Sequence, residues 1–228
     1  MNLALFGAQK RRGVMAVSIC VLDLLSVSTE KNCIKSFGEA EEKRLEAIKN
    51  PTRRQESVAG LTALKKALGN RAFCSIVRDQ NGRPRFEKDM GIDFNISHSG
   101  SLAVAAVCDG NDTCIGVDIE LVKTEKLQPL LRVAERYFED TEKEKFYKTH
   151  DVLNFYKAWT AKEAKAKLLG VGLAKSLGEK KEPPRAFFTS HYLVLHSGER
   201  YVLCLCSAVD GREDIDFITE HDTSVSPL

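Results

Sequence analysis

Helical and strand-like patterns occur in the same order in the two halves of this chain, and this repeat constrains the fold more than any other feature. In each half, segments with apolar residues at helical spacing precede short runs rich in apolar and β-branched residues. A chain of 228 residues can form one large domain or two small ones. We therefore expect helices and strands in both halves, with a boundary near residue 110.

The first half contains the clearest helix. Val58, Leu61, Leu64 and Leu68 recur at helical spacing, and Gly69 suits the end of that helix. The elements expected here are a strand at 15–25, helices at 39–50 and 52–70, a strand at 72–77 and a turn-rich loop at 78–86.

From residue 93 onward the pattern is mainly that of strands. We expect a strand at 93–97 and a loop at 98–100, then a hairpin of strands 101–107 and 113–120 joined by the turn-like CDGND. The later elements expected are a helix opening at TEKEKF with Thr141 and Glu144 at capping-box spacing, a helix at 154–169 ended by Gly170, strands at 186–195 and 200–208, and a frayed tail at 210–228.

Composition excludes several classes of protein. Hydrophobic and charged contents of 43% and 29% are those of a soluble globular protein. A net charge of +2 is too small to indicate a nucleic-acid or membrane partner. No run approaches the roughly 20 apolar residues of a membrane span, and MNLALFGAQKRRGVM does not have the order of a signal peptide. We expect a cytoplasmic protein, with Met15 as a candidate initiator and residues 1–14 as an extension.

The seven cysteines form no CxxC pair and no cluster of zinc spacing. An odd number of such cysteines is typical of reduced thiols in the cytosol. Cys204 and Cys206 stand two apart and share one face of an expected strand, where we expect them to pack against a neighbouring element.

Asp118 and Glu120 in GVDIE point to the same side of an expected strand, because they stand two residues apart. Two like charges on one strand face repel each other unless a cation lies between them. Mg²⁺ suits such a place, since it takes carboxylate oxygens together with water and phosphate oxygens. The alternative is a solvated strand face at a sheet edge, which needs no ligand.

Trp159, Glu163 and Lys167 recur every four residues in NFYKAWTAKEAKAKLLG, so they project from nearly the same side of a helix. Glu163 can supply a third carboxylate, Lys167 an ammonium beside anything bound to the ion, and Trp159 a shielding ring. Three carboxylates, a lysine and a metal ion form an arrangement that handles phosphates. The alternative is that lysines only keep this helix soluble, as we expect of Lys162 and Lys165.

The segment FNISHSG places Ser97, His98 and Ser99 directly before Gly100. No nucleophile elbow surrounds the Ser-His pair, so a hydrolase is not indicated. Polar loop residues after a strand can instead bind phosphate, whereas a purely structural histidine is the alternative for His98.

Four arginines of the first half are further candidates, because guanidinium forks match phosphate geometry. They are Arg53, Arg54, Arg83 and Arg85. On their own they are equally compatible with an ordinary surface.

Together, FNISHSG, GVDIE and WTAKEAKAK, in this order and at these distances, closely resemble the three motifs of the 4′-phosphopantetheinyl transferases. The similarity is to the larger, surfactin-type group, in the variant with tryptophan followed by Lys-Glu-Ala. It is strong from Asp93 to Gly172 and looser in the first half, through NPTRRQESVAGLTAL and NGRPRF.

The resemblance implies an α+β fold, a pseudo-dimer of two similar α/β subdomains, each a small antiparallel sheet packed with helices. The subdomains would cover residues 1–110 and 111–228, with the metal site in the second. The resemblance also implies an enzyme of the holo-[acyl-carrier-protein] synthase type. It would transfer the 4′-phosphopantetheine group of coenzyme A to a serine of an apo acyl or peptidyl carrier protein and release adenosine 3′,5′-bisphosphate. Fatty-acid, polyketide and nonribosomal peptide carriers all fit, and the length favours a monomer.

The resemblance assigns roles to matching positions. Asp118, Glu120 and Glu163 would hold Mg²⁺ on the pyrophosphate of coenzyme A. Glu163 would also help to deprotonate the carrier serine, directly or through a water, and Lys167 would stabilise or protonate the leaving bisphosphate.

A second set of residues would bind coenzyme A itself. Its members are Arg53, Ser57, Gly82, Arg83, Ser97 and His98. Ser97 and His98 would contact the 3′-phosphate region, and Gly82 and Arg83 the adenosine.

Two other functions remain open beside this one. A non-catalytic protein could keep the fold and only bind coenzyme A or a carrier domain, although it would not need Asp118, Glu120, Glu163 and Lys167 together. A metal-dependent phosphohydrolase is the third, and no histidine-rich or aspartate-rich metal motif supports it.

The resemblance also indicates where a carrier would dock. We expect the contact surface to combine residues 121–138 with the helix 154–169. Because carriers are acidic, Arg132, Arg136 and Lys157 would face such a partner.

Overall fold

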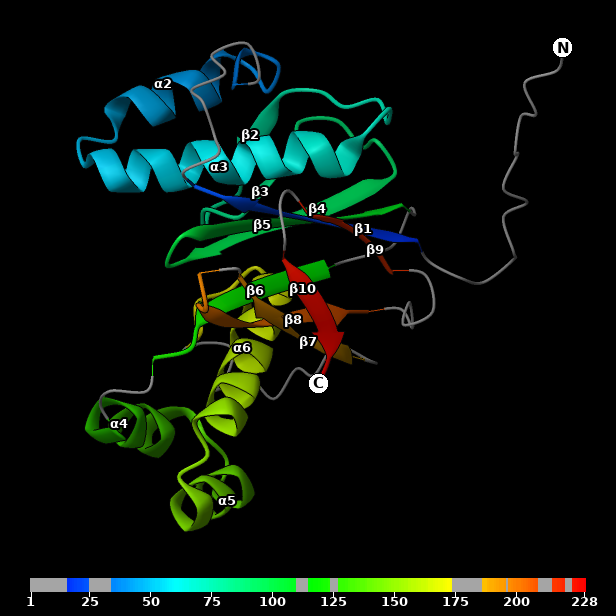
Figure 1. Cartoon of the computed structure of the whole chain (residues 1–228). Coiled ribbons are helices and arrows are strands. Elements are labelled where there is room, and N and C mark those ends of the chain that lie inside the picture. The colour runs from blue at the N-terminus through cyan, green and yellow to red at the C-terminus, as the bar shows by residue number, and fades with distance from the viewer. Residues whose placement is uncertain are drawn as a thin grey trace, which may run out of the picture.

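The computed structural model describes eight segments of the chain. They are residues 16–24, 34–109, 115–123, 127–173, 186–195, 197–208, 215–219 and 223–228. Within them, two four-stranded sheets stack on each other between helices (Figure 1). The expected extension at residues 1–14 lies outside the described residues.

The first sheet has the spatial order β4 (Ile92–Ser99), β5 (Leu102–Asp109), β1 (Val17–Asp23) and β9 (Ile215–Thr219). β5 is antiparallel to both of its neighbours, and β9 runs parallel to β1. Because β9 comes from the C-terminal part of the chain, the two halves of the sequence share this sheet. The division of the chain at residue 110 stays a prediction.

The second sheet has the order β10 (Ser224–Pro227), β7 (Phe187–Val194), β8 (Arg200–Ser207) and β6 (Ile115–Leu121). All its neighbours are antiparallel. β6 is an edge strand of this sheet, and it is the edge that faces the first sheet at β4.

The repeat seen in the sequence is a repeat of topology. β1, α3 (Pro51–Leu68), β4 and β5 follow one another as β6, α6 (Val152–Leu169), β7 and β8 do. In each set the first strand pairs with the last, and the connecting helix has 18 residues. Smaller elements are added to each set: α2 (Glu39–Ala47), β2 (Ile76–Arg78) and β3 (Pro84–Phe86) in the first, α4 (Leu127–Tyr137) and α5 (Asp140–Thr149) in the second. The fold is α+β, with small, mainly antiparallel sheets packed with helices, as expected.

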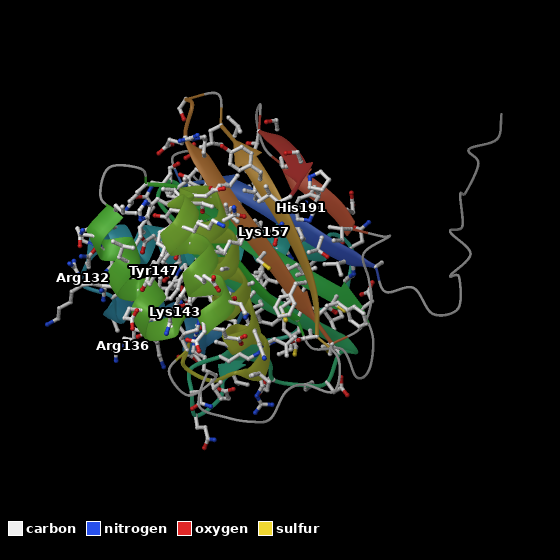
Figure 2. All side chains as sticks on the ribbon, turned by 90° about the horizontal axis from the view of Figure 1, so that it is seen from below. Arg132, Arg136, Lys143, Tyr147, Lys157 and His191 are labelled. Carbon is white, nitrogen blue, oxygen red and sulfur yellow. The ribbon has the colours of Figure 1, made fainter. Side chains whose placement is uncertain are left out.

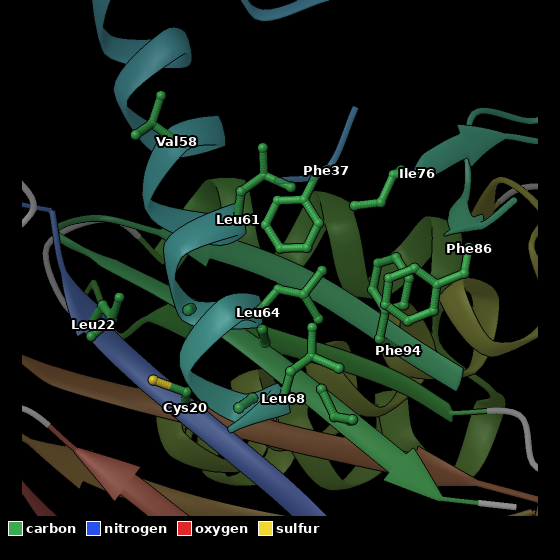
Figure 3. Close-up of a cluster of buried hydrophobic side chains, with 14 of the residues drawn as sticks. Cys20, Leu22, Phe37, Val58, Leu61, Leu64, Leu68, Ile76, Phe86 and Phe94 are labelled. Carbon is green, nitrogen blue, oxygen red and sulfur yellow. The ribbon is translucent and has the colours of Figure 1, made fainter. Parts of the chain in front are cut away.

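Successive side chains of a strand point to opposite faces of its sheet, and this explains how the sheets and helices form layers. Cys20 and Leu22 of β1 face α3 and pack with its leucines (Figure 3), whereas Ile19 and Val21 face the second sheet. The predicted helical stripe Val58, Leu61, Leu64 and Leu68 is buried in that first core. Apolar side chains from both faces of each sheet therefore exclude water from three consecutive interfaces.

Cys204 and Cys206 of β8 pack against Ala164 and Leu168 of α6. Burial raises the pKa of each thiol to about 12. Both are free thiols. The prediction that these two residues serve packing is confirmed.

Side chains of β4 bind the backbone of β6 where the two sheets meet. Asp93 Oδ2 accepts from Ile115 N at 2.8 Å, Asn95 Oδ1 from Val117 N at 3.0 Å, and Ser99 Oγ from Leu121 N at 3.1 Å. Asp93, Asn95 and Ser99, which share one face of β4, thus each satisfy an N–H group of β6. These three hydrogen bonds fix the position of β4, and so of the first sheet, relative to β6 of the second.

The hairpin expected from 101–107 and 113–120 is wrong. β5 pairs with β4 on one side and β1 on the other, so neither edge is left for β6. β6 pairs with β8 instead. Adjacent strands in the sequence therefore enter different sheets.

Three smaller expectations are also wrong. The capping box of α5 is formed by Glu139 and Glu142, not by Thr141 and Glu144. Residues 72–75 are not in a strand, because β2 begins at Ile76. β9 and β10 form in the tail that was expected to fray, because β1 and β7 each offer an edge. Among the described helices, none has the length and apolar character needed to span a membrane.

Candidate functional site

β6 lies directly against α6 at Gly116. A Cβ at this position would overlap the carbonyl oxygen of Ala164 and lie 2.5 Å from Leu168 N. Only glycine permits this approach, which brings the carboxylates of β6 close to the last turns of α6. The glycine of GVDIE is thus required by packing.

Asp118 is buried beneath α6, with 4% of its surface exposed. Its Oδ1 accepts from Ser97 Oγ at 2.9 Å and from Lys167 Nζ at 2.7 Å. The Lys167 ammonium also donates to Ser97 Oγ at 2.6 Å. Within the described residues, Asp118 Oδ2 is buried and has no hydrogen-bond partner.

Glu120 lies on the same face of β6 and is held from two sides. Ser99 Oγ donates to its Oε2 at 2.9 Å, and Trp159 Nε1 donates to its Oε1 at 3.2 Å. Burial, followed by the neighbouring Asp118, raises the pKa of the Glu120 carboxyl. The Trp159 ring packs edge-on against Tyr137 of α4, with ring centroids 5.6 Å apart.

Glu163 projects from α6 towards these two carboxylates. Burial raises its pKa most, Asp118 and Glu120 raise it further, and only Lys167 opposes the shift. In the described segments Glu163 makes no hydrogen bond or ion pair. The structure thus brings together four predicted side chains, although nowhere in its described part do three His, Cys, Asp or Glu side chains form a group that could hold a metal.

Arg53, Ser57 and His98 line one open hollow of about 730 Å³, together with Ile48, Lys49, Asn50 and Glu56. The hollow lies at the N-terminal end of α3, where Asn50 caps the helix by accepting from Arg53 N at 3.0 Å. Such a helix end attracts anions. Arg53 makes no ion pair in the described part of the chain.

His98 lines this hollow, and the charges of Lys167 and Asp118 both act on its imidazole. Its Nδ1 lies 3.6 Å from Glu56 Oε2. Burial lowers the pKa of His98 most, and Lys167 lowers it further, against the opposing effects of Glu56 and Asp118. The two groups of predicted residues are therefore neighbours across β4.

Arg83 lies beside Asp93 at the other end of β4 and reaches the backbone of Lys167, and Gly82 precedes it in the chain. Arg83 Nη2 pairs with Asp93 Oδ2 at 2.9 Å, and the side chain of Arg83 is only 14% exposed. The guanidinium also donates to backbone carbonyls of α6 and β6. The predicted contact of Gly82 and Arg83 with a nucleotide is not tested by this arrangement.

The sequence patterns did not identify two polar residues of this region, Glu56 and Asp93. Glu56 had no motif to single it out. Asp93 could have been found, because Asp93, Asn95, Ser97 and Ser99 alternate along β4 and so share one face.

Comparison with known proteins gives a match between residues 114–211 and the family model of the 4′-phosphopantetheinyl transferase superfamily. The chain is also similar to "4'-phosphopantetheinyl transferase psf-1" of Bacillus pumilus, with 35% identity over 42% of this chain and 40% of the relative. A 4′-phosphopantetheinyl transferase of Bacillus subtilis is 34% identical over 51% of this chain and 50% of its own length. The chain thus spans half or less of these curated relatives.

Proposed function

We propose that this chain transfers 4′-phosphopantetheine from coenzyme A to a serine of an apo acyl or peptidyl carrier protein, because residues 114–211 match the family model of the 4′-phosphopantetheinyl transferase superfamily. Adenosine 3′,5′-bisphosphate would be the second product. The main support is the meeting of Asp118, Glu120, Glu163 and Lys167 between β6 and α6.

We propose Mg²⁺ as the cofactor, held by Asp118, Glu120 and Glu163. The donor set fits, because carboxylate oxygens suit Mg²⁺ and Asp118 Oδ2 is buried with no partner among the described residues. Mg²⁺ is usually held by one or two carboxylates plus water and phosphate oxygens, so a closed cage of three is not required. When bound, the ion would neutralise charge on the pyrophosphate.

Glu163 is the carboxylate best suited to accept the proton of the carrier serine. Asp118 and Glu120 are engaged by hydrogen bonds, whereas Glu163 has none in the described part. A serine hydroxyl is a weak nucleophile and needs such a base within hydrogen-bond distance.

Lys167 is placed to stabilise the leaving bisphosphate. Its ammonium is held by Ser97 and Asp118, so it needs little rearrangement when charge develops nearby. Phosphoryl transfer depends mainly on positioning and on such charge stabilisation.

The hollow at the start of α3 is the proposed site for the phosphates of coenzyme A. Arg53, Ser57 and His98 offer a cation, a hydroxyl and an imidazole beside the helix N-terminus. Lys167 and Asp118 act electrostatically on His98, so a ligand in the hollow would lie near the carboxylates. A contact of Gly82 and Arg83 with adenosine has less support, because both Nη atoms of Arg83 already donate to protein groups.

An acidic carrier would meet basic side chains on the face formed by α4, α5 and α6. Figure 2 shows Arg132 and Arg136 projecting from α4, with Lys157 on the neighbouring α6. Opposite charges steer association and fix orientation. The same proposal takes the protein to be a cytoplasmic monomer.

The proposal is tested by incubating the purified protein with coenzyme A, Mg²⁺ and several apo carrier proteins and measuring the intact mass of each carrier. We expect one carrier serine to gain a phosphopantetheine arm. Binding of coenzyme A without an adduct on any carrier would support a binding protein instead. Release of phosphate without an adduct would support a phosphohydrolase.

A further inference from the structure

Arg83 lies where the first half of the chain meets α6 and β6. It follows a tight turn in which Asp79 Oδ1 accepts from the backbone N–H groups of Asn81 and Arg83, at 2.8 and 3.0 Å. Gly82 has the positive φ of 84° that this turn needs. The turn therefore fixes the backbone from which the Arg83 side chain projects.

The guanidinium of Arg83 joins three separate elements. Nη1 donates to the backbone oxygen of Lys167 and, at 3.2 Å, to that of Leu168. Nη2 donates to the backbone oxygen of Ile115 at 2.9 Å and to both carboxylate oxygens of Asp93, at 2.9 and 3.1 Å. Arg83 thereby holds the end of α6, the start of β6 and the start of β4 together.

Arginine is well suited to this place on physical grounds. The carbonyls in the last turn of a helix have few intrahelical partners, and that end of the helix attracts cations. Asp93 is itself fixed, because it also accepts from the backbone N–H groups of Phe94 and Ile115. A planar guanidinium can serve a carboxylate and several carbonyls at once, which a lysine ammonium cannot do with the same geometry.

This contact bears directly on the candidate site through Lys167. The backbone oxygen of Lys167 accepts from Arg83, while its ammonium binds Ser97 and Asp118. Any movement of the end of α6 would displace that ammonium. Arg83 thus acts on the site through the backbone of a residue that belongs to it.

We propose that Arg83 is a positioning residue that fixes the end of α6 against β4 and β6 and thereby places the Lys167 ammonium for transfer. The inference rests on the proposed function, because it takes Lys167 to act on the leaving group. It assigns Arg83 a role in the rate of the step and not in the affinity for the nucleotide.

Steady-state kinetics of Arg83→Met and Arg83→Lys separate these two roles. Displacement of a reacting group by about 1 Å can cost about 100-fold in rate. We therefore expect both variants to lose kcat by about 10-fold or more, with KM for coenzyme A changed by less than about twofold. A rise of KM with unchanged kcat, corrected in Arg83→Lys by its retained charge, would assign Arg83 to the nucleotide and overturn the proposal.

Arg85→Met is the matched control, because Arg85 is exposed on the same short hairpin. It should retain the kcat and KM of the wild type. Loss of kcat in Arg85→Met to the same extent as in Arg83→Met would overturn the proposal, since the effect would then belong to the hairpin as a whole.

Hydrogen–deuterium exchange of residues 160–170, read by mass spectrometry, tests the contact without any transfer assay. We expect faster exchange in Arg83→Met than in the wild type and in Arg85→Met, because the end of α6 loses its external partners. Unchanged exchange would overturn the proposal. If the wild-type protein shows no transfer, the proposed function fails, while the exchange result still decides whether Arg83 holds α6.

Discussion

Replacing Gly116 with alanine tests the close approach of β6 to α6, on which the candidate site depends. The added methyl group would lie 2.5 Å from Leu168 N and 3.1 Å from the carbonyl carbon of Ala164. Favourable contacts between carbon atoms begin at about 3.5 Å. These neighbours are backbone atoms and cannot rotate away, so strand and helix must separate by about 1 Å.

Gly116→Ala should reduce the rate of transfer more severely than it reduces the stability of the fold. Overpacking of this kind costs about 1–3 kcal/mol in the free energy of unfolding. For a chain of this length, that is a fall of about 2–12 °C in Tm. A separation of about 1 Å between the carboxylates of β6 and the side chains of α6 can reduce the rate about 100-fold.

The assay is phosphopantetheine transfer at a temperature well below the Tm of the variant, with circular dichroism as the check on folding. Gly172→Ala is the control, because a Cβ there meets nothing within 4 Å. It should match the wild type in both measurements. A Gly116→Ala variant with wild-type Tm and wild-type rate would refute the argument from close packing.

Three further predictions concern single side chains. Lys167→Met leaves the buried Asp118 carboxylate without its cation, so the free energy of unfolding measured in urea should fall by about 3 kcal/mol. A fall of less than about 1 kcal/mol would mean that water screens the pair. Trp159→Phe keeps an aromatic ring but removes the N–H that holds Glu120, so half-maximal transfer should need more Mg²⁺ while the far-ultraviolet circular dichroism spectrum is unchanged. An unaltered Mg²⁺ requirement would contradict this role. Burial lowers the pKa of His191, whose Nε2 has no partner among the described residues. The free energy of unfolding should therefore keep its full value above about pH 6.5 and decline as the pH falls below that value, because the unfolded chain takes up the proton first. Urea unfolding from pH 8 to 5 should show a shallower decline of this free energy with pH in His191→Phe than in the wild type. Equal slopes in the two proteins would exclude His191 as the cause.

Local patterns were sufficient to predict most helices and strands. The spacing of Val58, Leu61, Leu64 and Leu68 predicted α3, and Gly170 marked the end of α6 correctly. The alternation of Asp118 and Glu120 placed both carboxylates on one face of β6, where Ser97, Ser99 and Trp159 hold them. Periodicity works here because each element presents one apolar face to a neighbour.

Pairing between strands could not be predicted in the same way. The hairpin expected of β5 and β6 fails because β1, about 80 residues earlier in the sequence, occupies the free edge of β5. No local sequence pattern shows which strand will pair with a given sheet edge. The hydrogen-bond partners of Arg83 could not be predicted for the same reason, since three of them are backbone oxygens of distant segments.

We propose that Glu163 and its neighbours on β6 carry out transfer from coenzyme A. The most direct test compares wild type and Glu163→Gln, at equal concentrations of folded protein, for carrier mass and for released adenosine 3′,5′-bisphosphate. Glutamine keeps the size of the side chain but cannot accept the serine proton. We predict equimolar adduct and bisphosphate with the wild type and neither product with Glu163→Gln. Near-normal formation of both products by Glu163→Gln would contradict the assignment of this site.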